Sequence, residues 1–174
     1  MTEKTTQPLV VVSSKTGNTM TLAHVLCDAF PDAVLVRADA LPEDLSGFEP
    51  VFLGFWCDRG MAPEDMTAAA KKVSGKRIGC FATLGGNPED PKAQAWMRKT
   101  AESLVGLGGG NSLEALFLCR GRIDPAIFEQ MTKMTGGEPS PEREARRQAS
   151  ETHPDRLDLI GVAAAFRSAF GAQD

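Results

Sequence analysis

The sequence predicts an α/β domain built on a doubly wound, five-stranded parallel sheet in the strand order 2-1-3-4-5. Two observations predict this fold: short apolar runs alternate with longer helical patterns, and turn residues separate them along the chain. The length of 174 residues suits one domain, which buries about 70% of its extended-chain surface on folding. We therefore expect a single domain over residues 1–174.

The first apolar run, Leu9–Ser13, is expected to be a buried strand because it is almost wholly aliphatic. The pattern that follows, Asn18–Phe30, carries a broad apolar stripe of the kind that covers a sheet. The next two strands are expected at Ala33–Arg37 and Val51–Phe55. Both lie between turn residues.

Two further helices are expected at Pro63–Val73 and Pro91–Leu104, and each begins near a proline, which favours the first turn of a helix. The fourth and fifth strands are expected at Arg77–Ala82 and Leu113–Cys119, and a last helix at Asp155–Phe170. Because strands and helices alternate, the carboxyl ends of all five strands should meet at one edge of the sheet.

The segment Ile123–Pro154 interrupts this alternation. It predicts a short helix from Asp124 through Met134, then a turn rich in glycine and proline, then the charged run Glu142–Ser150. A charged run is most often a solvated face, so residues 123–154 are expected to form a helical excursion after the fifth strand. Long connections in compact domains also serve as lids or partner-docking elements, and the sequence leaves both interpretations open.

Composition limits the class of partner. The net charge of −4 argues against nucleic acid. The four cysteines show no C-x-x-C spacing, which favours a reducing compartment. The sequence has neither an apolar signal core nor a run of about 20 apolar residues, the length that a membrane span needs. We therefore expect a cytoplasmic protein with no membrane partner, as a monomer or weak dimer.

Several catalytic motifs are missing from the sequence. It has no P-loop, no G-x-S-x-G and no H-E-x-x-H. The glycine-rich stretch Gly106–Gly110 follows a helix and precedes a strand, which is the reverse of the dinucleotide-binding order. His153, directly before Pro154, is expected at the surface. No catalytic or metal-ligating residue is predicted.

Three loops at the carboxyl ends of strands carry the candidate binding residues. In the first loop, hydroxyls, an amide, a glycine and successive backbone N–H groups precede a helix, which suits a phosphate, although ordinary turns use the same residues. The candidate cofactor-binding residues are Ser14, Lys15, Thr16, Gly17, Asn18 and Thr19 in the first loop, Phe55, Trp56, Cys57, Asp58, Arg59 and Gly60 in the second, and Thr83, Leu84, Gly85, Gly86 and Asn87 in the third.

The segment Ser14-x-Thr16-Gly17-Asn18-Thr19 resembles the phosphate loop of flavodoxins and flavodoxin-like proteins, which bind flavin mononucleotide (FMN). In that family hydroxyls, the Asn side chain and backbone amides hold the flavin phosphate. The segment Gly54-Phe55-Trp56 is similar to the first flavin-flanking loop of the family. The resemblance implies FMN as cofactor, with Trp56 packed on the isoalloxazine ring.

The resemblance also implies a function. The backbone from Cys57 to Gly60 would face the reactive edge of the flavin, and electrons would pass from a donor reductase to an acceptor enzyme. The Gly-Phe-Trp-Cys-Asp segment and the excursion after the fifth strand resemble a flavodoxin-like subfamily of anaerobic bacteria. One member type of that subfamily accompanies the enzyme that reduces bilirubin.

The chain departs from the family pattern in the third loop. Ordinary flavodoxins often stack a tyrosine on the outer flavin face there, whereas this sequence contains no tyrosine. Arg59, with Arg120 or Arg122, would favour the anionic reduced flavin if it lies near the ring, which predicts a less reducing flavin. The open face also suits an FMN-dependent reductase of a quinone, tetrapyrrole or small electrophile. A flavin-free interaction domain is the third alternative.

Overall fold

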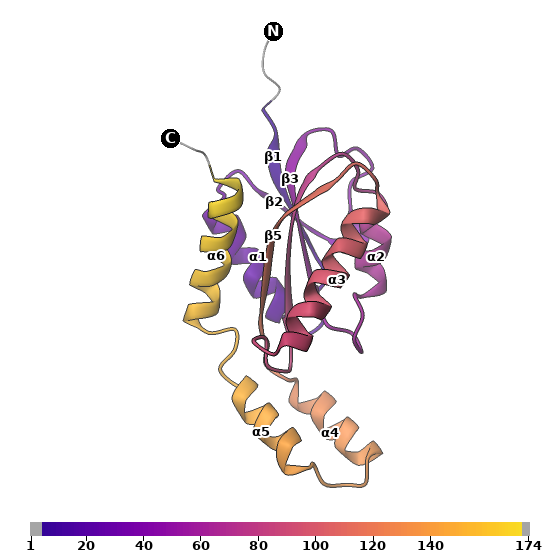
Figure 1. The fold of residues 1–174 in the computed structure, drawn as a ribbon, viewed down its shortest axis with the longest axis vertical. Coiled ribbons are helices and arrows are strands. Elements are labelled where there is room, and N and C mark those ends of the chain that lie inside the picture. The colour runs from indigo at the N-terminus through magenta and orange to yellow at the C-terminus, as the bar shows by residue number, and fades with distance from the viewer. Residues whose placement is uncertain (1–4, 172–174) are drawn as a thin grey trace.

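The computed structural model describes residues 5–171 and contains one five-stranded parallel sheet in the order β2-β1-β3-β4-β5 (Figure 1). The predicted fold class and strand order are therefore confirmed. The strands are β1 (Gln7–Val12), β2 (Val34–Arg37), β3 (Phe48–Trp56), β4 (Arg77–Leu84) and β5 (Ser112–Arg120).

Helices cover both faces of the sheet, with α1 and α6 on one side and α2 and α3 on the other (Figure 1). The two remaining helices, α4 and α5, form a hairpin that lies beyond the carboxyl edge of the sheet. Among residues 5–171 no helix combines the length and the apolar character that crossing a bilayer requires. The helices are α1 (Asn18–Ala29), α2 (Glu64–Ala70), α3 (Pro91–Leu107), α4 (Pro125–Met134), α5 (Pro141–Ser150) and α6 (Arg156–Phe170), with a short 3-10 helix, η1, at Ala38–Ala40.

The core lies on both faces of the sheet, as the aliphatic strands predict. Successive strand side chains point to opposite faces. Leu9 and Val11 therefore pack toward α2 and α3, whereas Val10 and Val12 pack toward α1 and α6, and all four are buried. On the second face Phe52 meets Phe166 with ring centroids 4.9 Å apart, nearly perpendicular.

Gly54 of β3 is required by its neighbour in β4. A Cβ built at Gly54 would lie 2.1 Å from the ring of Phe81, its partner in the parallel ladder. The aromatic ring fills the space that a side chain would need. A glycine at this position therefore lets β3 and a large core residue coexist.

Strands β3, β4 and β5 extend further than the sequence predicted. Trp56 pairs with Thr83 in the β3–β4 ladder, and Leu84 pairs with Arg120 in the β4–β5 ladder. These residues were expected in loops. Parallel hydrogen bonding continues through them, so Trp56, Thr83 and Leu84 are strand ends with fixed backbone positions.

The excursion after β5 contains two helices with similar starts. The Asp124 carboxylate accepts from the N–H groups of Ala126 and Ile127 at 2.8 and 3.1 Å, and Pro125 opens α4. The Ser140 hydroxyl accepts from Arg143 N–H at 3.2 Å at the start of α5. Such caps and first-turn prolines stabilise helix N-termini. The charged run of the sequence is thus helix α5.

Candidate functional site

The first loop joins β1 to α1 and has a specific backbone geometry. The Ser14 hydroxyl accepts hydrogen bonds from Gly17 N–H at 3.2 Å and from Met20 N–H at 3.3 Å. Gly17 has φ of 98°, a left-handed conformation that glycine adopts without steric cost. A Cβ there would meet nothing within 4 Å, so the loop borders open space.

Several backbone N–H groups of this loop are free to bind a ligand, among them three at the start of α1. Within residues 5–171 the N–H groups of Thr16, Asn18 and Thr19 have no hydrogen-bond acceptor. They lie at the N-terminus of a helix of 12 residues, where the helix dipole favours an anion. The loop therefore fits a phosphate group, which offers several acceptor oxygens.

The side chains of Asn18 and Thr19 in the first loop already have protein partners. The Thr19 and Thr83 hydroxyls lie 3.0 Å apart, and both residues are buried. The Asn18 Nδ2 donates to the Arg122 carbonyl at 2.9 Å and to the Thr16 hydroxyl at 3.4 Å. A phosphate in the loop would therefore meet the backbone N–H of Thr19 rather than its hydroxyl.

The second loop contains a tight turn. Asp58 and Met61 exchange backbone hydrogen bonds at 2.8 and 2.9 Å, and the two residues between them, Arg59 and Gly60, have φ of 51° and 76°. Positive φ at both central residues is typical of a type I′ turn. The indole N–H of Trp96 in α3 donates to the Gly60 carbonyl at 2.9 Å. The turn is thus attached to the helix beneath it.

Phe55 and Trp56 point to opposite sides of β3. Phe55 is fully buried and packs edge-on against Trp96 with centroids 6.2 Å apart. Its side chain therefore lies in the core that faces α2 and α3, and its expected part in binding a cofactor stays a prediction. Trp56 is only half-buried, and the Lys15 ammonium lies 5.5 Å from its ring centroid. The first and second loops meet through this contact.

The Cys57 thiol lies at the start of the same turn. Burial raises the pKa of Cys57, the N–H of Gly60 opposes this shift, and the charge of Asp58 adds to it. The thiol is therefore protonated near neutral pH and is a weak nucleophile. Burial alone raises the pKa of Cys80, in the core, to about 12.

The third loop is fixed to the chain that follows β5. Gly121 N–H donates to the Leu84 carbonyl at 2.8 Å, and Arg120 Nε donates to the Gly86 carbonyl at 3.1 Å. The side-chain oxygen of Asn87 accepts a hydrogen bond from Glu89 N–H at 3.0 Å, which closes a local turn. Arg120 is thus a cation in contact with a candidate loop.

Arg59 and Arg122 are placed differently from Arg120. The Arg59 side chain is 94% exposed and lies 3.4 Å from the Asp58 carboxylate, which offsets its charge. Arg122 is exposed as well. Of these three arginines, Arg120 is the one whose guanidinium, within residues 5–171, donates to the backbone of a candidate loop.

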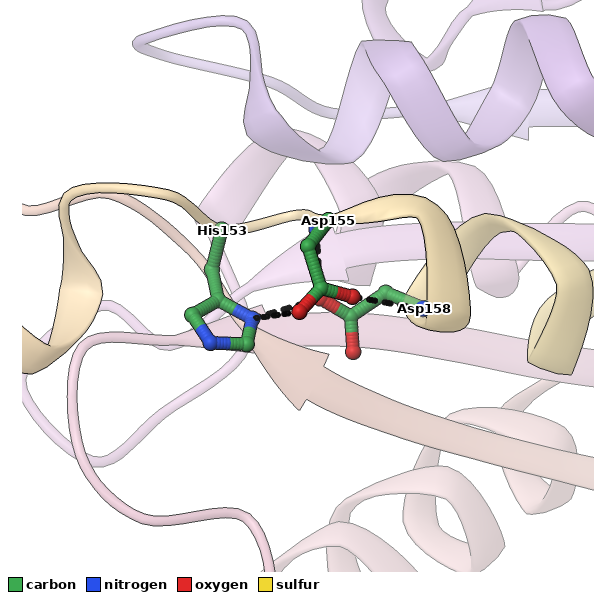
Figure 2. A group of neighbouring side chains, drawn as sticks. All are labelled: His153, Asp155 and Asp158. Atoms are coloured by element: carbon green, nitrogen blue, oxygen red, sulfur yellow. Dashed lines mark hydrogen bonds and ion pairs between the residues drawn. The ribbon is translucent and has the colours of Figure 1, made fainter.

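A further polar group lies where the hairpin meets α6, and the sequence reasoning missed it. Figure 2 shows His153, Asp155 and Asp158, with His153 Nδ1 2.6 Å from Asp158 and 3.7 Å from Asp155. His153 was expected at the surface, and the structure shows it half-buried, with its side chain 23% exposed. The reason is that the segment between α5 and α6, which contains His153, folds onto the start of α6. The D-x-x-D spacing could have revealed a capping box.

The two aspartates of this group cap α6 reciprocally. Asp155 accepts from Asp158 N–H at 3.0 Å, and Asp158 accepts from Asp155 N–H at 2.7 Å. The bond from Asp158 N–H lowers the pKa of Asp155, burial opposes this shift, and the charge of His153 adds a smaller lowering. Hydrogen bonding within the helix start thus accounts for the arrangement of these carboxylates.

Comparison with known proteins gives matches along nearly the whole chain. A flavodoxin domain family model matches residues 9–167. The flavodoxin-like domain-containing protein BilS of Clostridioides difficile (strain CD3) is 26% identical over 164 residues, which cover 87% of this chain and 89% of that protein.

Solved structures show the same fold at low sequence identity. Flavodoxin 2 of Bacillus cereus has a TM-score of 0.53 at 15% identity, over 89% of this chain and 98% of that one. The flavodoxin of Streptococcus pneumoniae TIGR4 has a TM-score of 0.52 at 15% identity, over 93% and 98%. The two-electron reduced flavodoxin of Megasphaera elsdenii has a TM-score of 0.51 at 19% identity, over 83% and 98%.

Proposed function

Because the chain belongs to the flavodoxin domain family, for which FMN is the cofactor, we propose that it carries electrons from a donor reductase to an acceptor enzyme. FMN would bind noncovalently at the carboxyl edge of the sheet, between the three loops. Bound FMN supplies the redox chemistry, while the protein positions it and adjusts its electronic properties.

One observation carries this proposal: the free N–H groups of Thr16, Asn18 and Thr19 at the start of α1. They would donate to the phosphate of FMN, and the Ser14 hydroxyl, which accepts from Gly17 and Met20, holds the loop in shape. The exposed Thr16 hydroxyl would add a further donor. No metal is needed, because the N–H groups and the helix dipole favour the anion.

The second and third loops would hold the ring. Trp56, half-buried beside the first loop, offers an aromatic face for stacking. The backbone of Cys57 to Gly60 would lie along the ring edge, fixed by the bond from Trp96 to Gly60. The third loop, with two glycines and no tyrosine, would leave the outer face of the ring open to a partner.

Besides Arg59, which Asp58 partly neutralises, two cations lie at these loops, Lys15 beside Trp56 and Arg120 on the Gly86 carbonyl. A cation near the flavin stabilises the anionic reduced form relative to the oxidised form. We therefore propose a flavin that is less reducing than in a typical flavodoxin. This property suits transfer to an acceptor of moderate potential.

The acceptor we propose is an enzyme that reduces a tetrapyrrole such as bilirubin. The similarity to the protein named BilS supports this choice, since the same subfamily resemblance appears in the second loop and in the excursion after β5. The donor would be a reductase, and the carrier would work in the cytoplasm of an anaerobe as a monomer or weak dimer. The net charge of −4 disfavours nucleic acid as a partner.

An absorption spectrum of the purified protein, before and after adding FMN and removing the excess, tests the cofactor. Retained flavin absorbance supports the proposal, and protein that stays colourless supports the flavin-free alternative. Electron transfer is tested by reducing the loaded protein and mixing it with an acceptor enzyme. Turnover of reduced nicotinamide with a small electrophile, in the absence of a second protein, would instead support a self-contained reductase.

A further inference from the structure

Strand β5 forms one edge of the sheet, and within residues 5–171 no strand pairs with its outer side. A bulge at Glu114 marks its first part, after which the ladder with β4 is regular from Ala115 to Arg120. Native proteins commonly protect such edges with lysine, proline or a covering segment, because free N–H and C=O groups can pair with another chain. Between Ala115 and Cys119 β5 has neither a charged residue nor a proline. The regular part of this edge therefore lacks the usual protection.

The side chains at this edge are incompletely covered on both faces of the sheet. Leu116 and Leu118 pack against the core that faces α2 and α3, and a groove of about 410 Å³ lies beside them, between α3 and β5. Ala115 and Phe117 pack against the core that faces α1 and α6. All four are only partly buried. A strand added beside β5 would extend both core layers and also pair the backbone, which a helix or loop on one face would not do.

Helix α6 continues the apolar surface on the Phe117 side of β5. A Cβ at Gly161 would lie 2.9 Å from the Phe117 ring, so the helix passes directly over this side chain. Leu157 and Ala164, four residues before and three residues after Gly161, share its side of the helix. Both are exposed, Leu157 to 75%. An exposed aliphatic side chain therefore lies next to the uncovered edge.

The backbone of β5 limits how a partner strand can pair. Gly121 N–H donates to the Leu84 carbonyl of β4 at 2.8 Å. Since backbone groups of successive strand residues point alternately to the two sides of the strand, Leu116 and Leu118 direct their N–H and C=O groups away from β4. The opposite edge of the sheet, β2, has only four residues. Of the two edges of the sheet, β5 is thus the one that offers a long apolar strand, and a second copy of the chain supplies another.

The charges at the two ends of β5 favour one register between two such strands. In an antiparallel pair with its two-fold axis at Phe117, Leu116 lies opposite Leu118 and Glu114 lies opposite Arg120. The axis repeats both pairs, and opposite charges on facing positions stabilise a sheet. In the two neighbouring registers the residue opposite Arg120 is not acidic.

Both charged groups can take part in such a pair. The Arg120 guanidinium donates to the carbonyl groups of Gly86 and Ala149, and within residues 5–171 it pairs with no carboxylate. Glu114 is bonded to Arg77 through one carboxylate oxygen at 2.7 Å, and its side chain is 34% exposed. The cation of one copy would therefore gain a carboxylate partner from the other.

We propose that two copies of this chain pair through antiparallel β5 strands, with the two-fold axis at Phe117, to form one continuous sheet. Directly opposite residues of an antiparallel pair lie on the same face of the sheet, so the two α6 helices flank the axis on one face and the two α3 helices on the other. Leu157 of each copy is then covered. This inference goes beyond the proposed function and does not depend on FMN.

Sedimentation velocity of the full chain over a concentration series tests the assembly. We expect wild-type protein to shift from one to two chains per particle. Glu114→Lys should raise the dissociation constant of the dimer by at least about tenfold, because like charges then face each other twice. Adding Arg120→Glu to Glu114→Lys should recover most of this loss, since opposite charges face each other again. Wild-type protein that stays monomeric throughout, or a double variant no better than Glu114→Lys, would overturn the inference.

A matched pair of variants tests the part of α6. Leu157→Lys should weaken the dimer, whereas Met134→Lys, which places the same charge at an 80% exposed position at the end of α4, should leave it unchanged. Equal effects of the two variants would contradict the assigned interface.

Amide hydrogen exchange of wild-type protein reports the strand pairing without any substitution. Exchange at Leu116 and Leu118 should slow as the dimer fraction rises, because their outward N–H groups gain acceptors, while exchange at Phe117, whose N–H points toward β4, should change less. A dimer with unchanged exchange at Leu116 and Leu118 would place the interface elsewhere and overturn the inference. The proposed function would stand in each of these cases, since retained flavin is measured separately.

Discussion

Trp96 of α3 donates its indole N–H to the carbonyl of Gly60, 36 positions earlier in the chain, at 2.9 Å. The bond ties an exposed turn to a helix on one face of the sheet. The turn includes Arg59 at φ of 51°, a conformation that is unfavourable for a residue with a side chain. The tie from Trp96 thus helps to hold a backbone geometry that Arg59 alone would not prefer.

Trp96→Phe should loosen this turn and leave the fold intact. Phenylalanine keeps the packing against Phe55 but cannot donate to Gly60, so we expect a loss of about 1 kcal/mol in the free energy of unfolding. Urea denaturation measures the loss, and amide exchange at Met61 should quicken because its bond to Asp58 opens more often. Unchanged exchange at Met61 would contradict the role given to Trp96.

Thr19→Val and Thr83→Val should each destabilise the protein, and the double variant should be more stable than the sum predicts. Each single change leaves one buried hydroxyl without its 3.0 Å partner, at a cost of about 1–3 kcal/mol. Replacing both hydroxyls removes the unpaired group. A double-mutant cycle from urea unfolding measures the coupling, and strictly additive losses would show that the hydroxyls do not depend on each other.

Gly54→Ala should cost about 3 kcal/mol or more, because the new methyl group would meet the Phe81 ring at 2.1 Å and overpack the core. Phe81→Leu in the same background should recover much of this loss, since the smaller side chain makes room. Chemical denaturation of the single and double variants tests both expectations. Gly47→Ala, where nothing lies within 4 Å, serves as the neutral control.

Asp155 should contribute a pH-dependent part of the stability. Its pKa in the folded protein is lowered, chiefly by the N–H of Asp158, so the contribution is full above the unfolded pKa of about 3.9 and is lost as pH falls through the lower folded value. Asp155→Asn keeps a capping side chain without the charge. Its unfolding free energy should therefore fall less steeply in acid than that of the wild type, as denaturation at a series of pH values would show.

Arg120→Gln should make the potential of bound FMN more negative, since a cation that favours the anionic reduced form is removed. We expect about 20 mV, the two-electron equivalent of about 1 kcal/mol. Potentiometric titration measures it. Arg120→Lys should stay nearer the wild type, and Arg167→Gln, on the last turn of α6, should have no effect. A similar shift in all three variants would show that the effect is not local to Arg120.

The sheet could be predicted from the sequence because its strands are aliphatic runs buried on both faces and separated by helices of ordinary length. Because both faces are buried, the sequence pattern does not predict which way a single side chain points. With both faces apolar, no alternation shows that Phe55 points inward while Trp56 reaches the edge. The first loop was found because its residues are adjacent in sequence. Contacts such as Trp96 to Gly60 and Asn18 to Arg122 join distant segments, and no local pattern encodes them.

Helices α4 and α5 stand off the carboxyl edge as a hairpin, and their base is bonded to the domain at Arg120, Arg122 and His153 (Figure 1). Their far end bears exposed methionines at positions 131 and 134 and takes no part in packing the sheet. Natural variation can therefore lengthen or shorten that tip, or substitute its side chains, while the sheet and its loops stay constant. The hairpin tip and the loops at the carboxyl edge are in this way free to diverge at different rates.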